Sequence, residues 1–226
     1  MKLMFLGTGA ADWDINAPER EEGFRRYTST LVDGCLLIDP GPCVIEALET
    51  FGVDKKRIKY IINTHNHRDH YNTETIDILE EAGAEFIAFS AGETKELGGY
   101  KISAYTANHG TCKDAIHFII EDGSKKLFYG LDSAWLLYDE VKAIKEKHID
   151  LAVLDGTIGE TEGDYRIFEH NNLRMIREMK LTLNDYVDRF FISHMARTLH
   201  TDHNTLSELM KKDGIEVAYD GLEITI

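Results

Sequence analysis

The sequence predicts a mixed α/β protein, and three observations lead to this class. Short apolar runs rich in β-branched and aromatic residues alternate with stretches of helical period. Two pairs of these runs flank the turn signals Asp33-Gly34 and Asp122-Gly123, which are typical of β-hairpins. No linker, repeat or low-complexity block interrupts residues 1–226, so we expect a single domain.

The first half of the chain alternates strand and helix signals around one irregular segment. Residues 11–27 are polar and lack any period, which indicates a surface loop. The expected elements are strands at Lys2–Leu6, Thr28–Val32 and Cys35–Asp39, a helix at Val44–Phe51, a buried strand at Ile58–Asn63, a helix at Thr73–Ala82 and a strand at Glu85–Phe89.

The second half continues the same alternation after residues 90–114, to which the pattern assigns no element. The expected elements are strands at Ala115–Glu121 and Lys125–Gly130, a helix at Leu136–Lys147, a strand at Ile149–Leu154, a helix at Asn171–Lys180, a strand at Arg189–Ile192, a helix at Thr205–Lys212, and strands at Glu216–Ala218 and Glu223–Ile226.

The sequence composition indicates in which cellular compartment the protein is expected. Neither a signal peptide nor an apolar stretch near the roughly 20 residues needed to cross a bilayer is present, so we expect a cytoplasmic protein without membrane contact. The cysteines are Cys35, Cys43 and Cys112, and their odd number and spacing imply neither a disulfide framework nor a thiolate zinc site.

Net charge narrows the class of partner. The formal charge of -15 disfavours binding of extended nucleic acid. A small anionic substrate remains compatible with it, because cations inside a pocket dominate the local field. The oligomeric state is left open, a homodimer included.

Four candidate metal ligands crowd the loop that follows the predicted strand Ile58–Asn63. Imidazole and carboxylate groups together suit zinc, manganese or iron. On an extended segment, residues two apart point the same way, so His65 and His67 can reach one ion while Asp69 and His70 face a neighbouring position. The alternative is a polar loop of unrelated residues.

This His-x-His-x-Asp-His segment after a strand resembles the hallmark of the metallo-β-lactamase-fold hydrolases. The resemblance implies a four-layer αβ/βα sandwich, in which two sheets pack together, helices cover both outer faces, and metals lie at one edge of the sheets. Arg68, where a small residue is common, and the absence of a glycine after the motif in Tyr71-Asn72-Thr73 depart from the family pattern.

The resemblance also identifies the remaining ligands at later positions. His109 matches the third histidine of one site, Asp132 a carboxylate that bridges both ions, and His194 the last ligand. Without the resemblance, His109 reads as a surface loop residue and Asp132 as a helix N-cap.

The resemblance also divides these ligands between two metal ions: three histidines bind the first ion, three residues bind the second, and one carboxylate binds both. The sets are His65, His67 and His109; Asp69, His70 and His194; and Asp132. Two divalent ions are expected, zinc or manganese, with iron also compatible, and a bridging hydroxide would be the nucleophile. Asp39 matches a buried acid that orients a ligand histidine, or is a turn residue before proline.

Within the superfamily, the sequence is most similar to the phosphodiesterase branch that contains tRNase Z and PhnP. The segment Glu169-His170-Asn171 resembles the one that supplies the catalytic histidine of PhnP-type enzymes. We therefore predict His170 and Asp69 as catalytic residues and Asn171 and His200 as substrate contacts. Asp155 is expected to support His170. The alternatives are a solvent-facing histidine and a turn aspartate.

The function that follows is hydrolysis of a small or cyclic phosphodiester by a binuclear metal centre. One alternative is a lactonase or thioesterase on the same scaffold, because an activated hydroxide also attacks carbonyl carbon. A second is a non-hydrolytic di-iron metal-binding or sensor protein. A nucleic-acid-binding module is disfavoured by the charge.

Overall fold

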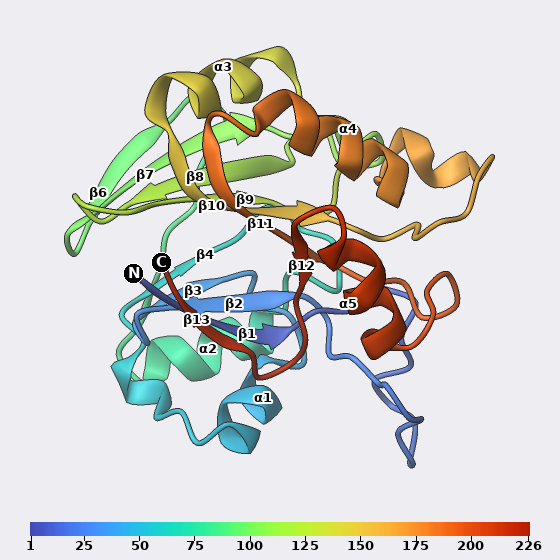
Figure 1. Cartoon of the computed structure of the whole chain (residues 1–226). Helices are drawn as coiled ribbons and strands as arrows, with labels where there is room; N and C mark the ends of the chain where they lie inside the picture. Colours follow the sequence, from blue (N-terminus) through green and yellow to red (C-terminus); the bar gives the residue numbers. More distant parts are fainter.

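Two mixed β-sheets packed face to face form the centre of the computed structural model, which describes residues 1–226 (Figure 1). The first sheet has the order β13-β1-β2-β3-β4-β5. Its strands are β1 (Lys2–Gly7), β2 (Ser29–Val32), β3 (Leu36–Ile38), β4 (Tyr60–Ile62), β5 (Glu85–Phe86) and β13 (Glu223–Thr225).

The second sheet has the order β12-β11-β10-β9-β8-β7-β6. Its strands are β6 (Thr94–Leu97), β7 (Tyr100–Thr106), β8 (Ile116–Glu121), β9 (Lys126–Gly130), β10 (Ile149–Asp155), β11 (Val187–Ser193) and β12 (Ile215–Val217).

Helices cover both outer faces, so the predicted four-layer sandwich is confirmed. Below the first sheet in Figure 1 lie α1 (Val44–Thr50) and α2 (Thr73–Glu81). Above the second sheet lie α3 (Tyr138–Lys147) and α4 (Leu173–Leu183), and α5 (His203–Lys211) packs beside β12. Two short 3-10 helices, η1 (Lys55–Arg57) and η2 (Tyr165–Phe168), lie in loops. No helix is long and apolar enough to cross a membrane.

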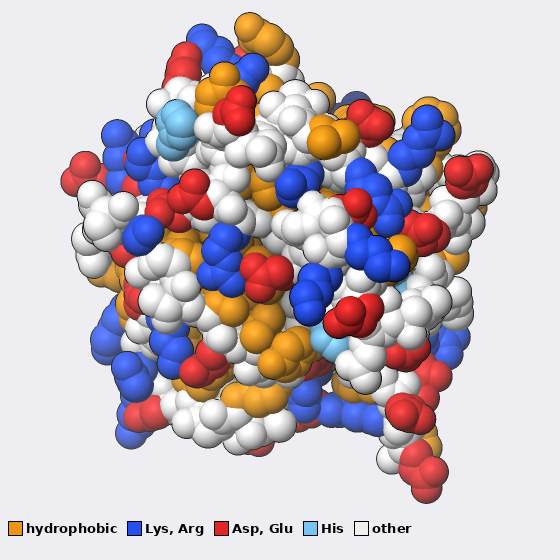
Figure 2. All heavy atoms as spheres, viewed as in Figure 1, with side chains coloured by type: hydrophobic (Ala, Val, Ile, Leu, Met, Phe, Trp, Pro, Cys, Tyr) orange, Lys and Arg blue, Asp and Glu red, His pale blue; other side chains and the backbone are white.

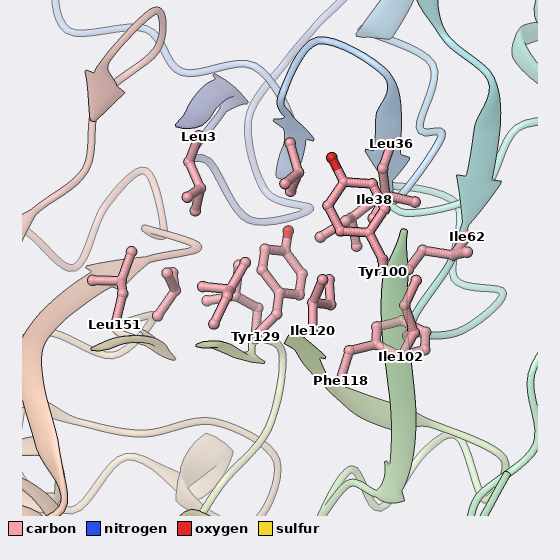
Figure 3. Close-up of a cluster of buried hydrophobic side chains, with 14 of the residues drawn as sticks. Leu3, Leu36, Ile38, Ile62, Tyr100, Ile102, Phe118, Ile120, Tyr129 and Leu151 are labelled. Carbon is pink, nitrogen blue, oxygen red and sulfur yellow. The ribbon is translucent and has the colours of Figure 1, made fainter. Parts of the chain in front are cut away.

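The main hydrophobic core fills the space between the sheets. In Figure 3, Leu36 and Ile38 of the first sheet face Tyr100 and Ile102 of the second. The rings of Phe5 and Phe191 stack across the same interface with centroids 5.9 Å apart. Separate clusters bury the inner faces of the helices against each sheet. Alternating apolar positions along the strands explain this division, because successive side chains point to opposite faces of a sheet.

Parallel pairing gathers strand ends at one edge of the sandwich. In the first sheet β3 and β4 are parallel, and in the second β9, β10, β11 and β12 are parallel. The carboxyl ends of neighbouring parallel strands meet at the same edge, where ligand sites of open α/β sheets usually form. Loops after these strands are therefore positioned to build a common site.

Most predicted elements agree with the structure to within a few residues, and the differences have physical causes. The turn Asp33-Gly34 lies between β2 and β3 with both residues at positive φ, 49° and 70°, and Val32 pairs with Leu36 across it, so the predicted hairpin is present. The strand predicted at Glu85–Phe89 ends at Phe86. Strands β6 and β7 fall in a segment for which no element was predicted.

Candidate metal centre

The loop after β4 carries the first four candidate ligands. It turns sharply, with the backbone N–H of His70 donating to His67 O at 3.0 Å. The turn packs tightly against the loop after β3, because a Cβ atom on Gly41 would lie 2.2 Å from Asp69 O. Glycine at position 41 thus permits the approach of the two loops. His65, Asp69 and His70 are buried and His67 is partly buried.

Three further candidate ligands arrive from the second sheet. His109 follows β7, Asp132 follows β9 and His194 follows β11, and all three are buried. The structure brings each of them to the 65–70 loop. His67 Nδ1 and His109 Nε2 lie 3.1 Å apart, and His70 Nε2 and His194 Nε2 lie 3.2 Å apart.

The seven side chains form two groups of potential ligand atoms that share Asp132. Within each group, every ligand atom lies within 4.8 Å of the others. The groups are His65, His67, His109 and Asp132, and Asp69, His70, Asp132 and His194. They are the same sets that the resemblance assigned to the two ions.

Unpartnered buried atoms test whether these residues fit metal ions. His65 Nε2, Asp69 Oδ2, His109 Nδ1 and Asp132 Oδ1 are buried and make no hydrogen bond. Buried polar atoms without partners are costly and rare in folded proteins. Two nitrogens bound tetrahedrally to one zinc at about 2.0 Å are separated by about 3.3 Å, close to the nitrogen spacings observed here. The donor set fits two divalent cations.

Asp39 lies behind the second group and holds His70. Its Oδ2 accepts a hydrogen bond from His70 Nδ1 at 2.9 Å, and its Oδ1 accepts from the backbone N–H of Thr64 at 2.7 Å. This arrangement leaves His70 Nε2 facing the centre. A carboxylate that fixes the far nitrogen of a histidine sets the ring orientation and raises the basicity of the ligand.

Asp155 plays the corresponding part at the end of β10. Its Oδ2 accepts from His170 Nδ1 at 3.0 Å and from Thr157 Oγ1 at 2.9 Å. His194 Nδ1 in turn donates to Thr157 Oγ1 at 2.7 Å. Asp155 therefore holds His170 directly and His194 largely through Thr157.

Two aspartates and one histidine of the centre have left-handed backbone conformations. The φ angles of Asp39, Asp132 and His194 are 62°, 55° and 63°. Such angles are uncommon outside glycine and are maintained where surrounding structure requires them. Each of the three residues directly follows a strand or lies two residues beyond its end, so the left-handed turn directs the side chain towards the common edge.

In the metal-free centre, the surroundings lower the pKa of some histidines and raise the pKa of others. Burial, together with the neighbouring His70, lowers the pKa of His65 to about 4. Burial also opposes protonation of His194, but Asp132, Asp155 and Asp69 outweigh it and raise the pKa to about 10. The histidines hold the pKa of Asp132 well below its usual range despite burial. Divalent cations would take the place of these shared protons.

His170 borders the same cavity as the ligands. Its Nδ1 lies 3.2 Å from Asp132 Oδ1 in addition to its contact with Asp155. Its Nε2 makes no hydrogen bond to protein, and its side chain is 15% exposed. Burial disfavours protonation, yet Asp155 and Asp132 raise the pKa of this imidazole above its ordinary value. The solvent-facing alternative for His170 does not describe its position.

The structure places the two predicted substrate contacts outside the cavity lining. Asn171 is buried, with Nδ2 donating to Ser133 O at 3.0 Å and its backbone N–H to Asp155 Oδ1 at 3.1 Å. His200 donates from Nε2 to Thr157 O at 3.0 Å and lines a neighbouring cavity. Both residues brace the site from behind, and nothing in their positions supports substrate contact.

The cavity at the centre has a volume of about 200 Å³ and includes residues that the sequence did not single out. They are Asp12, Thr111, Thr157, Arg166 and Glu169. Trp13, in the loop expected at the surface, is buried and donates from Nε1 to Met195 O at 2.8 Å. Apart from Glu169, which lies in the segment that contains His170, no local motif marks these positions.

Comparison with known proteins agrees with this geometry. The sequence model of the metallo-beta-lactamase superfamily matches residues 23–72, and no curated protein matches the sequence.

Solved structures match over nearly the whole chain. Zn(2+)-bound PqqB from Methylobacterium extorquens has a TM-score of 0.78 at 16% identity, covering 100% of both chains. A diphosphatase from the PhnP family has a TM-score of 0.73 at 20% identity, covering 100% of this chain and 97% of that one. The short form of human tRNase Z has a TM-score of 0.71 at 16% identity, covering 100% and 99%. The chain therefore has the metallo-beta-lactamase fold, and its residues 23–72 match the sequence model of that superfamily.

Proposed function

We propose that this protein is a binuclear metal-dependent hydrolase that cleaves a small or cyclic phosphodiester. The observation that carries the proposal is the position of His170, which Asp155 holds beside Asp132 with Nε2 free in the cavity. Hydrolysis of a phosphodiester requires a proton for the leaving alkoxide, and an imidazole placed in this way can donate one.

The seven residues around Asp132 would hold the ions, which are zinc or manganese in this proposal, with iron also accepted by the same donors. When bound, such ions polarise a phosphoryl oxygen and lower the pKa of water. Asp39 and Thr157 would keep His70 and His194 turned towards the ions.

The chain's own acid–base step lies with His170. The Asp155 carboxylate favours the protonated imidazole, so Nε2–H is available to the leaving oxygen as its bond to phosphorus breaks. The imidazole ring then becomes neutral, and its Nδ1–H continues to donate a hydrogen bond to Asp155. A proton from solvent returns to Nε2 before the next turnover. Asp155 is thus a positioning residue for His170.

Charge supports a small substrate rather than an extended nucleic acid. The chain carries a formal charge of -15. On the face seen in Figure 2, basic and acidic side chains are interspersed, and no broad basic area is present. The PhnP-family diphosphatase and tRNase Z share the fold at low identity, and their names support phosphate chemistry as the class to test first.

The test is turnover of bis(p-nitrophenyl) phosphate and of cyclic nucleotides by protein loaded with defined metals. We expect H170Q to lower kcat on the cyclic nucleotides, whose leaving alkoxide needs a proton, by roughly 100-fold or more with metal content unchanged. The loss on bis(p-nitrophenyl) phosphate should be smaller, because p-nitrophenolate leaves without a proton. H148Q is the matched control, because His148 is exposed at the end of α3.

Two results would contradict the proposal. Absence of turnover of every phosphodiester by loaded protein would reject the phosphodiesterase assignment. If the protein cleaves no phosphodiester but does cleave an ester or a lactone, and H170Q retains that cleavage, the same centre would instead be assigned to carbonyl chemistry.

A further inference from the structure

Arg166 is the one lysine or arginine whose side chain lines the metal cavity. We propose that Arg166 binds a second anionic group of the substrate, carried on the leaving side of the scissile bond. This inference rests on the proposed function and deepens it, since it names the class of phosphodiester that the site selects.

The guanidinium of Arg166 is held in one orientation. Asp164 Oδ1 accepts from Arg166 Nε at 2.9 Å, and Asp164 Oδ2 accepts from the terminal Nη2 at 2.6 Å. The same carboxylate accepts the backbone N–H of Arg166 at 2.9 Å and so begins η2. The other terminal nitrogen, Nη1, makes no hydrogen bond and retains its donors.

Backbone hydrogen bonds place Arg166 and His170 in one turn. The carbonyl oxygen of Arg166 accepts the N–H groups of both Glu169 and His170 at 2.8 Å. The cation and the proton donor therefore reach the cavity from the same short segment. Because His170 would protonate the leaving oxygen, a negative group close to Arg166 belongs to the leaving portion of the substrate.

The acids that share the cavity do not neutralise Arg166. Asp12 accepts the backbone N–H of Arg197 on both oxygens, at 2.9 and 3.0 Å. Glu169 accepts Thr111 Oγ1 at 3.2 Å. Neither carboxylate lies within ion-pair distance of Arg166, whose sole ion pair is with Asp164. The side chain is 33% exposed, so incoming solute can reach it.

The ligand chemistry that follows is a carboxylate or phosphate held by a fixed guanidinium. Arginine suits this task because its planar fork matches the oxygens of both groups. Substrates of this class are phosphodiesters whose leaving alcohol carries an acid, and diphosphates whose leaving group is itself a phosphate.

A matched pair of chromogenic esters tests the preference. Methyl p-nitrophenyl phosphate has a leaving group without any charged substituent, and its analogue with a carboxylate meta to the phenolic oxygen carries one additional negative charge on the leaving group. We expect metal-loaded wild-type protein to favour the carboxylate analogue in kcat/KM by roughly tenfold to a hundredfold, the range for one hydrogen bond to a charged group. R166Q should abolish the preference, and R166K should retain part of it.

A binding measurement separates this role from effects on chemistry or folding. Calorimetric titration should show methylenebisphosphonate binding more tightly than methylphosphonate, with the difference lost in R166Q. R174Q is the control, since Arg174 is exposed on α4 without any hydrogen bond or ion pair, and it should keep both preferences.

The outcomes distinguish this inference from the proposed function. Turnover of both esters with equal kcat/KM, or equal losses on both in R166Q, would overturn the role of Arg166 while leaving the phosphodiesterase intact. No turnover of either ester would reject the phosphodiesterase itself, and the calorimetric comparison would still report whether Arg166 binds the second anion.

Discussion

Two buried aspartates organise the centre at the scale of single residues. Asp39 and Asp155 follow or end parallel strands of different sheets, and each accepts both a backbone N–H and an imidazole N–H. Asp39 turns His70 Nε2 towards the candidate metal centre, and Asp155 fixes His170. The centre thus depends on acids that need not touch metal or substrate.

Replacing Asp39 with asparagine tests this dependence. In D39N the amide can still accept from Thr64 but presents N–H groups to His70 Nδ1, so the ring loses its acceptor. We expect metal affinity to fall by roughly 10- to 100-fold. Competition with a chromogenic chelator measures this affinity, and D77N on the exposed face of α2 is the control. Unchanged affinity in D39N would show that Asp39 has no part in orienting the ligand.

Individual site residues were predictable only where a local pattern marked them. The four ligands after β4 stand together in sequence, and the resemblance supplied His109, Asp132 and His194 from distant strand ends. Arg166 had no such mark, because its place depends on Asp164 and on a turn of η2 that composition does not reveal. Asn171 follows the catalytic candidate in sequence, yet its side chain turns away to Ser133.

At the scale of elements, a buried pair joins α3 to the second sheet. His117 on β8 donates from Nδ1 to Glu140 Oε1 at 2.5 Å and from Nε2 to Leu131 O at 3.1 Å. Glu140 Oε2 also accepts the N–H of Leu137 and so caps α3. His117 and Glu140 are fully buried. The pair therefore fixes both the start of a helix and the end of the strand that precedes Asp132.

Breaking this pair should be costly. E140A leaves the imidazole of His117 and the N–H of Leu137 without acceptors, and loss of about 3–5 kcal/mol of unfolding free energy is expected. The double variant H117L/E140L should be less destabilised than E140A, because it removes the unpaired imidazole, although the Leu137 N–H still lacks its acceptor. Urea unfolding measures both. A double variant at least as unstable as E140A would contradict this account.

Helices and strands were predictable where the spacing of hydrophobic residues and the turn-favouring residues at their ends indicated the same element. The hairpin of β2 and β3 and the buried strands of the core satisfied both conditions. Strands β6 and β7 did not, because β6 is an edge strand with no buried residue and carries two adjacent charged side chains, Lys95 and Glu96. The Gly98-Gly99 pair between them, at φ 56° and 100°, was the available signal for a hairpin.

At the scale of the whole molecule, two sheets that pack through an apolar core deliver ligands from opposite sides. The loop after β4 comes from the first sheet, and Asp132 and His194 come from the second. Local sequence predicted the strands, but their division between two sheets came from the family resemblance, since short strands alone do not specify their neighbours. Folding and binding of metal ions at this centre would consequently be coupled.

Removal of metal should make global stability depend on pH in a defined direction. The folded-state pKa of His194 is about 10, above its ordinary 6.5, so its stabilising effect is complete below pH 6.5 and is lost as pH rises towards 10. The pKa values of Asp69 and Asp132 are lowered, so their contributions are present above roughly pH 4 and are lost in acid.

The lowered pKa of His65, about 4, costs stability as pH falls below its ordinary 6.5. The metal-free protein should therefore be most stable near pH 6.5, and its Tm should fall on the alkaline side. Metal-loaded protein should not show this alkaline decline, because cations replace the protons, and loading should release protons to the buffer. Scanning calorimetry with and without chelator measures the Tm values. A metal-free Tm that rises between pH 7 and 10 would contradict the assigned charge states.

The left-handed backbone at Asp39, Asp132 and His194 implies a trade-off between the placement of these side chains and stability. Such a conformation costs of the order of 1–3 kcal/mol for a residue with a side chain, and glycine would adopt it freely. The chain therefore gives up intrinsic stability at three places to aim donors at one point. Placement of the potential metal ligands, rather than backbone stability, accounts for these side chains at these positions.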